Sequence, residues 1–188
     1  MIIRNATIND APFIALVVVE ALGDDIMERY PDSISDQDRR KLALIADSIC
    51  REGTLYSWRH TLIAEGQDGH PIGAIVSYEG EGYLEMRRRT FAMLGELITF
   101  DVESMDAEAR PGEYYLDSLS VLPEYRGNGV GRLLIQSAVS MARSLFLPAT
   151  LACEPNNLGA KDLYESLGFR HDGDLFIFGH HYLRMLAE

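Results

Sequence analysis

The sequence predicts an α+β fold, a single domain in which helices flank a mixed, largely antiparallel central sheet. Short apolar runs of strand type alternate with longer stretches whose apolar residues recur at helical spacing. Some strands are joined by a hairpin loop and others through helices, which favours mixed pairing. The 188 residues suffice for one domain with a substantial core, and no repeat or low-complexity tract divides them.

The first half of the chain is expected to contribute two helices and three strands. Residues 1–8 are predicted to form an edge or early strand, and residues 11–23 a helix that ends at a glycine. A second helix, capped by serine and aspartate, covers residues 35–51. Residues 57–65 and 71–78 are apolar runs joined by a polar, glycine-containing loop, a pattern that predicts a β-hairpin.

Residues 80–112 do not continue the sheet and are interpreted as an insertion. Their apolar residues suggest one helix, and the acidic stretch 103–111 suggests an exposed loop. We expect the insertion to lie over one edge of the fold, where such segments often shape substrate pockets. The remaining expected elements are a strand at 114–121, a helix from about 130, a strand at 149–153, a helix at 158–167, and strands at 169–178 and 181–187.

Composition narrows the class of function. The net charge of −12 argues against a nucleic-acid partner, because such proteins need basic patches that neutralise phosphates. The charge either keeps the protein soluble or attracts a cationic substrate such as an amine. No apolar run approaches a membrane span and no signal peptide is evident, so no membrane partner is expected. Cys50 and Cys153 are isolated, which indicates reduced packing residues in a cytoplasmic protein.

A glycine-rich turn follows the predicted strand at 114–121. Gly127, Gly129 and Gly131 stand at every second position, and a helical pattern begins directly after them. The first amides of a helix are unpaired and carry the positive end of its dipole, so this arrangement predicts a site for a phosphorylated ligand. A dinucleotide fingerprint would need the third glycine one residue later. A P-loop would need glycine at Arg132, so neither nucleotide motif is present.

A second motif lies about thirty residues downstream. Residues 157–169 have the pattern N-x-x-A-x-x-L-Y-E-x-x-G-F, and residues 126–131 have R-x-x-G-x-G. Together the two motifs resemble the GNAT superfamily of N-acetyltransferases, and residues 3–11 are similar to that family's first strand and helix. The resemblance covers nearly the whole chain apart from the insertion. It is specific for the fold and the cofactor, and it says little about the acceptor.

The resemblance implies that the ligand is acetyl-CoA. In this family the turn amides cradle the pyrophosphate, and the preceding strand splays away from its neighbour. By position, Leu119 and Val121 would bind the pantetheine and acetyl parts, where an amide donor can also stabilise the oxyanion. Asn157 matches the position that contacts the cofactor arm. The residues implied at the pyrophosphate are Arg126, Gly127, Asn128, Gly129, Val130, Gly131 and Arg132.

Two proton transfers are required, because a protonated amine must lose a proton and the coenzyme thiolate must gain one. Tyr164 matches the family tyrosine that donates to the sulfur; by itself it would read as a core aromatic. Asp117 lies two residues before Leu119, so both side chains are expected on one face. It is the candidate base, directly or through water, or else a salt-bridged strand-end carboxylate. Glu79 is a weaker rival for the same role.

The acceptor pocket is expected near the end of the first helix. By resemblance to the family, Glu20, Asp24 and Asp25 could bind a cationic group there, although a solvated helix end explains them better. The adjacent histidines His180 and His181 are assigned no metal.

The sequence therefore predicts a cytoplasmic, acetyl-CoA-dependent N-acetyltransferase. It would move an acetyl group to a primary amine of a small molecule, by direct transfer in a ternary complex. No cysteine occupies a motif position, so a covalent acetyl-enzyme is not indicated. The alternatives are acetylation of a protein or peptide N-terminus, and a non-catalytic acyl-CoA-binding regulatory protein on the same fold. The sequence is also compatible with a homodimer of this chain.

Overall fold

A single sheet of seven strands forms the centre of the computed structural model, which describes residues 1–188 apart from the side chain of Glu96. Its order is β1-β2-β3-β4-β5-β7-β6, and among the described strands only β4 and β5 pair in parallel. This confirms the predicted α+β class with a largely antiparallel sheet. The strands are β1 (Ile2–Asn5), β2 (Thr61–Glu65), β3 (Pro71–Glu79), β4 (Tyr114–Val121), β5 (Ala149–Cys153), β6 (Arg170–Ile177) and β7 (His180–Ala187).

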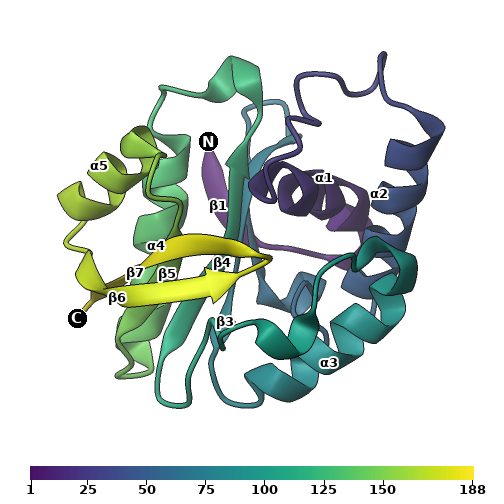
Figure 1. The fold of residues 1–188 in the computed structure, drawn as a ribbon. Helices are drawn as coiled ribbons and strands as arrows, with labels where there is room; N and C mark the ends of the chain where they lie inside the picture. Colours follow the sequence, from purple (N-terminus) through teal and green to yellow (C-terminus); the bar gives the residue numbers. More distant parts are fainter.

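Five α-helices of the described chain cover the sheet (Figure 1). Helices α1, α2 and α3 pack on one side, where α1 contacts β3 and β4 and lies against α2. Helix α4 packs on the other side, against β1 to β5. The helices are α1 (Ala11–Ala21), α2 (Asp36–Ile49), α3 (Tyr83–Leu94), α4 (Val130–Ser144) and α5 (Leu158–Ser166).

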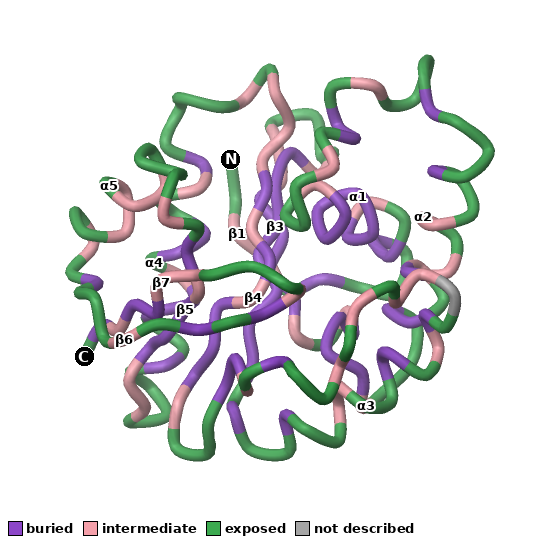
Figure 2. The backbone as a smooth tube through the Cα atoms, in the orientation of Figure 1, coloured by how far each residue is buried: buried purple, intermediate pink, exposed green. Residues whose placement is uncertain are grey.

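Alternation along the central strands builds a core on each face of the sheet. In β2 and β3, Ile63, Ala74 and Val76 join the core on the α1 side, whereas Leu62 and Ile75 join the core on the α4 side. Helix α1 is apolar on nearly every side because it lies between the sheet and α2. Figure 2 shows this burial concentrated along the central strands and α1.

The insertion differs from the prediction in where it packs. Phe91, in α3, is buried in the same core as α1, so the segment covers a face of the sheet and not only its edge. It also reaches the last hairpin, because Asp106 accepts a hydrogen bond from the Phe176 amide (2.7 Å) and its own amide donates back (3.0 Å). Its two ends meet at Gly80, where a Cβ would come 2.0 Å from the Arg110 carbonyl oxygen.

The predicted strand at 57–65 starts later than expected. Trp58–His60 forms a short 3-10 turn, closed by a bond from the His60 amide to the Ser57 carbonyl (2.8 Å), and the strand begins at Thr61. The guanidinium of Arg59 lies 4.4 Å above the Trp58 ring. Local turn geometry thus overrides the strand preference of these residues. Within the described chain, none of the helices combines the length and apolar character needed to span a membrane.

Candidate active site

The cleft begins where β4 and β5 separate. The two strands pair only from Tyr114 to Leu116, opposite Ala149 to Leu151. Beyond Leu116, β4 continues along β3 while β5 continues along β7. A cleft of about 680 Å³ opens between them, bounded by the glycine turn, the start of α4, α5 and the end of α1.

A β-bulge places Asp117 at the mouth of this split. Val76 pairs with Ser118 and Ser77 pairs with Leu116, so Asp117 is the extra residue of β4. Bulges of this kind re-aim a side chain and interrupt the ladder locally. Asp117 and Leu119 both line the cleft.

Asp117 is held by hydroxyl groups and not by a cation. The Tyr78 hydroxyl donates to Oδ2 (2.5 Å), and the Ser118 hydroxyl donates to Oδ1 (2.7 Å). Burial raises the pKa of Asp117, while these two bonds and the nearby His60 act in the opposite direction. No basic ion-pair partner lies beside it in the described part of the chain, so the salt-bridge explanation finds no support.

The glycine turn presents bare backbone to the cleft. Gly127 (φ +76°) and Gly129 (φ +79°) adopt left-handed conformations, and a Cβ at either position would meet nothing within 4 Å. Helix α4 starts directly after Gly129, with no side-chain cap and no acidic residue in its first turn. Its first amides are therefore available to an anion, supported by the helix dipole.

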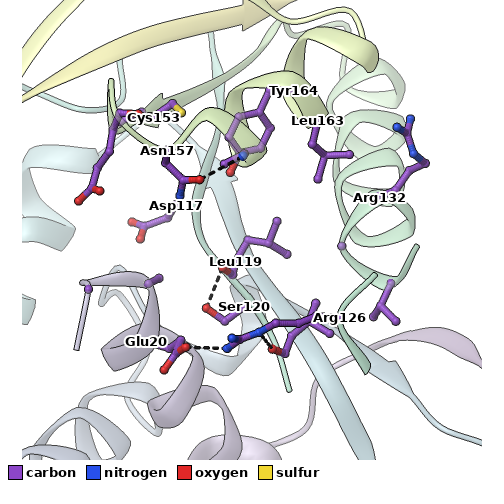
Figure 3. A pocket seen from close by; sticks show the side chains of 18 of the residues that line it. Glu20, Asp117, Leu119, Ser120, Arg126, Arg132, Cys153, Asn157, Leu163 and Tyr164 are labelled. Carbon is purple, nitrogen blue, oxygen red and sulfur yellow. Dashed lines mark hydrogen bonds and ion pairs between the residues drawn. The ribbon is translucent and has the colours of Figure 1, made fainter. Parts of the chain in front are cut away.

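Helix α5 supplies the opposite wall. Its N-cap is Asn157, whose Oδ1 accepts a hydrogen bond from the Ala160 amide (3.1 Å). Tyr164 also lines the cleft, and its ring packs edge-to-face on Phe169 at 5.9 Å between centroids. Burial raises the pKa of Tyr164 to about 12, so its hydroxyl keeps its proton at neutral pH. Figure 3 shows Asn157 and Tyr164 facing Leu119 across the cleft.

Comparison with known proteins identifies this arrangement. The model of the acetyltransferase (GNAT) family matches residues 19–169. The chain belongs to the GNAT acetyltransferase family. A solved acetyltransferase is 28% identical with a TM-score of 0.75, covering 100% of this chain and 99% of that one. The N-acetyltransferase from Staphylococcus aureus Mu50 is 26% identical with a TM-score of 0.78, and both chains are covered completely.

More distant structures share the fold alone. The ribosomal-protein-alanine N-acetyltransferase from Brucella melitensis is 21% identical with a TM-score of 0.58, covering 100% of this chain and 99% of that one. Among curated protein sequences, none matches this chain. The family and its structures therefore make the protein an acetyltransferase and leave its acceptor open.

Most of the predicted site residues of this acetyltransferase meet in the cleft. Those that line it are Glu20, Asp117, Leu119, Val121, Arg126, Gly127, Gly129, Val130, Gly131, Arg132, Asn157 and Tyr164. They come from α1, β4, the glycine turn, α4 and α5, which the sheet topology brings together.

Three predicted residues lie outside the cleft lining. Asn128 folds back on its own turn and donates to the carbonyl oxygens of Tyr125 (3.3 Å) and Arg126 (3.1 Å). Asp24 forms an ion pair with Lys41 of α2. Glu79 is exposed at the end of β3, where it pairs with Tyr114, and it does not line the cleft. The structure therefore does not place Asp24 or Glu79 where the acceptor was expected.

Arg126 is bonded to acidic side chains and to the strand that precedes it. Its guanidinium donates to Glu20 (2.7 Å) and Glu28 (2.9 Å), and its Nε donates to the Val121 carbonyl (3.0 Å). Figure 3 shows the contact with Glu20 across the lower end of the cleft. In this structure the side chain ties the glycine turn to the segment after α1, and the backbone amides are the groups that remain open to a phosphate.

Sequence reasoning missed three residues that line the cleft where β5 ends. Cys153 is buried, and burial raises the pKa of its thiol, so it is not an activated nucleophile. Glu154 follows it, and Tyr182 reaches the same wall from β7. Burial raises the pKa of Tyr182 to about 12, with the negative charge of Glu154 adding to the effect. No motif marks these positions, because only the split of β4 from β5 exposes them.

The histidines at the last hairpin lie apart from this cleft. His181 Nε2 lies 2.9 Å from Asp174 and His171 Nε2 lies 3.5 Å from the same carboxylate. In the described chain, no group of three or more His, Cys, Asp or Glu side chains is placed to hold a metal ion.

Proposed function

We propose that the protein is an acetyl-CoA-dependent N-acetyltransferase that transfers acetyl directly to a primary amine of a small molecule within a ternary complex. The observation that carries the proposal is one continuous cleft with an anion cradle at one end and Asp117 at the other. A phosphate-bearing donor and an amine acceptor can therefore enter from opposite ends and meet beside β4.

The cradle fits the pyrophosphate of acetyl-CoA. Open space beyond Gly127 and Gly129 leaves room for phosphate oxygens at the first amides of α4. The side chain of Arg132 lies beside the cleft and donates to the Ser166 hydroxyl (2.8 Å), which holds a positive charge near the cradle. Because β5 leaves β4 after Leu116, the backbone near Leu119 and Val121 is free to bind the pantetheine arm.

Asp117 is the proposed proton acceptor. A primary ammonium has a pKa near 10 and cannot attack until it loses a proton. Burial makes the Asp117 carboxylate more basic than an exposed aspartate, which suits it to take that proton directly or through water. The freed amine nitrogen then attacks the acetyl carbonyl carbon, and backbone N–H groups of β4 stabilise the developing oxyanion.

Tyr164 is the proposed proton donor. When the carbon–sulfur bond breaks, the nitrogen loses its second proton to solvent and the departing thiolate takes the hydroxyl proton. The phenolate then regains a proton from solvent. Since its pKa is about 12, Tyr164 stays protonated over the ordinary assay range. A regulatory protein that only binds acyl-CoA would not need a proton donor at this position.

The charge of the acceptor end supports a cationic substrate. Asp25 and Glu154 line the cleft together with Asp117, whereas Glu20 is neutralised by its ion pair with Arg126 of the glycine turn. An amine that enters there meets a negative field, which raises its local concentration. A peptide N-terminus is the alternative acceptor. The cytoplasmic location and the homodimer stay predictions from sequence.

The test is thiol release from acetyl-CoA with a panel of polyamines, amino acids, aminoglycosides and peptides. We expect release with at least one small primary amine, and loss of that release in Asp117→Asn. Release with peptides alone would favour the N-terminal alternative. Tight binding of acetyl-CoA without release to any acceptor would contradict the proposed activity.

A further inference from the structure

A second carboxyl group lies in the core behind Asp117. Glu108, contributed by the insertion, is only 6% exposed. The Tyr83 hydroxyl donates to its Oε1 (3.0 Å), and the Tyr115 hydroxyl donates to its Oε2 (3.0 Å). Burying a carboxyl group is costly unless hydrogen bonds satisfy it, and here two tyrosines do so.

The same tyrosines lead from Glu108 to Asp117. The ring of Tyr78 stacks on Tyr83, with centroids 6.5 Å apart and an interplanar angle of 16°. It also lies 5.9 Å from the Tyr115 ring, and its hydroxyl donates to Asp117 (2.5 Å). Both carboxyl groups are thus attached to one packed group of three tyrosines.

The surroundings do not neutralise either carboxyl group. In the described part of the chain, neither has a basic side chain at ion-pair distance. Burial raises the pKa of Glu108 to about 7, and the negative charge of Asp117 adds to this. The titratable and charged groups that face the two carboxyls are Tyr56, His60, Tyr78, Tyr83, Arg87, Tyr115 and Tyr182.

We propose that Glu108 is a positioning residue of the acetyl transfer. It holds the two tyrosines against which Tyr78, the hydroxyl donor to Asp117, is packed, and it lends its charge so that the two carboxyls accept one proton as a unit. The proposal rests on the proposed role of Asp117 as the base. The proton leaves the acceptor ammonium for the Asp117 carboxylate and later passes to solvent. A single negative charge remains on the pair while the proton is held, so the proton is held more tightly than by Asp117 alone.

The first test is the pH dependence of kcat/KM. Glu108→Gln removes the charge and keeps the size of the side chain, so the acid limb is expected to move down by about one pH unit. Glu108→Asp keeps the charge, so its acid limb should lie close to that of the natural protein. Glu103→Gln removes one exposed carboxylate from the same insertion and should leave the profile in place. A Glu108→Gln profile with an unmoved acid limb would overturn the proposal.

The second test does not depend on activity. Carboxyl carbons of ¹³C-labelled protein without substrates are followed by NMR as the pH is changed. In the natural protein, Asp117 and Glu108 should titrate in two shared steps, and in Glu108→Gln Asp117 should titrate in one step at lower pH. Unchanged titration of Asp117 in that variant would refute the role of Glu108 while leaving the acetyl transfer intact. Full activity of Asp117→Asn would instead refute the base itself, and the proposal with it.

Discussion

Comparing Gly129→Ala with Gly69→Ala separates the effect of backbone strain on stability from an effect on ligand binding. Gly129 (φ +79°) and Gly69 (φ +81°) have the same left-handed conformation, and a Cβ at either would meet nothing within 4 Å. Gly69 belongs to the β2–β3 hairpin loop, outside the cleft. An L-residue in this conformation costs about 1–2 kcal/mol. Each variant should therefore lose a similar amount, about 2–8 °C in Tm for a domain of this size.

Binding of coenzyme A should distinguish the two variants. The proposed cradle puts phosphate oxygens in the open space beside Gly129, so a Cβ there is expected to cost at least one bond to a phosphate oxygen. A bond to a charged group contributes about 1.5–3 kcal/mol, which corresponds to roughly a 10- to 150-fold rise in Kd. Gly69→Ala should bind with unchanged Kd in calorimetry. Equal Kd values for both variants would refute the phosphate cradle.

The remaining predictions concern catalysis, a buried ion pair and acid stability. Tyr164→Phe should lower kcat by roughly 100-fold with an unchanged Kd for coenzyme A; a wild-type kcat would remove it from the acid role. Arg184 is buried and paired with both Glu113 and Asp172, so Glu113→Ala leaves one partner in place and should cost about 1.5–3 kcal/mol in urea unfolding, and an unchanged urea midpoint would contradict this pairing. Hydrogen bonds from the N-cap serine, with Arg29, lower the pKa of Asp38 from 3.8 to about 2. The stabilisation by the Asp38 carboxylate is present above pH 3.8 and is lost as the pH falls towards 2. Asp38→Asn should therefore make the urea midpoint depend less steeply on pH over that range. An unchanged slope of the midpoint against pH would contradict this role.

The glycine turn could be predicted because its signals are local. Gly127 and Gly129 are needed at left-handed positions, and α4 starts at once behind them. The pattern around Asn157 and Tyr164 is equally local, since one short helix carries both. The strand at 114–121 and the helix at 158–167 were likewise predicted within a residue or so. The spacing of their apolar residues and the residues at their ends are both visible in the local sequence.

The sequence gives no information on a residue's surroundings where these depend on distant partners. Glu20 and Arg126 are separated by 106 positions, and only the packing of α1 beside the glycine turn makes them an ion pair. Glu79 was a reasonable rival to Asp117, but the antiparallel register pairs it with Tyr114 at the exposed end of β3, outside the cleft lining. Glu108 carried no signal, because an acidic residue in an acidic stretch resembles any exposed one.

The sequence by itself determined the α+β class, the family and the glycine turn before α4, because periodicity, glycine positions and the two motifs are local or nearly local properties. Tertiary structure alone decided which carboxyl groups face the cleft and which are buried behind it. The physical reason is that burial and charge coupling act through space, where the split of β4 from β5 and the docking of the insertion set the distances. Those distances turn Asp117 into a candidate base and bring Glu108 behind it.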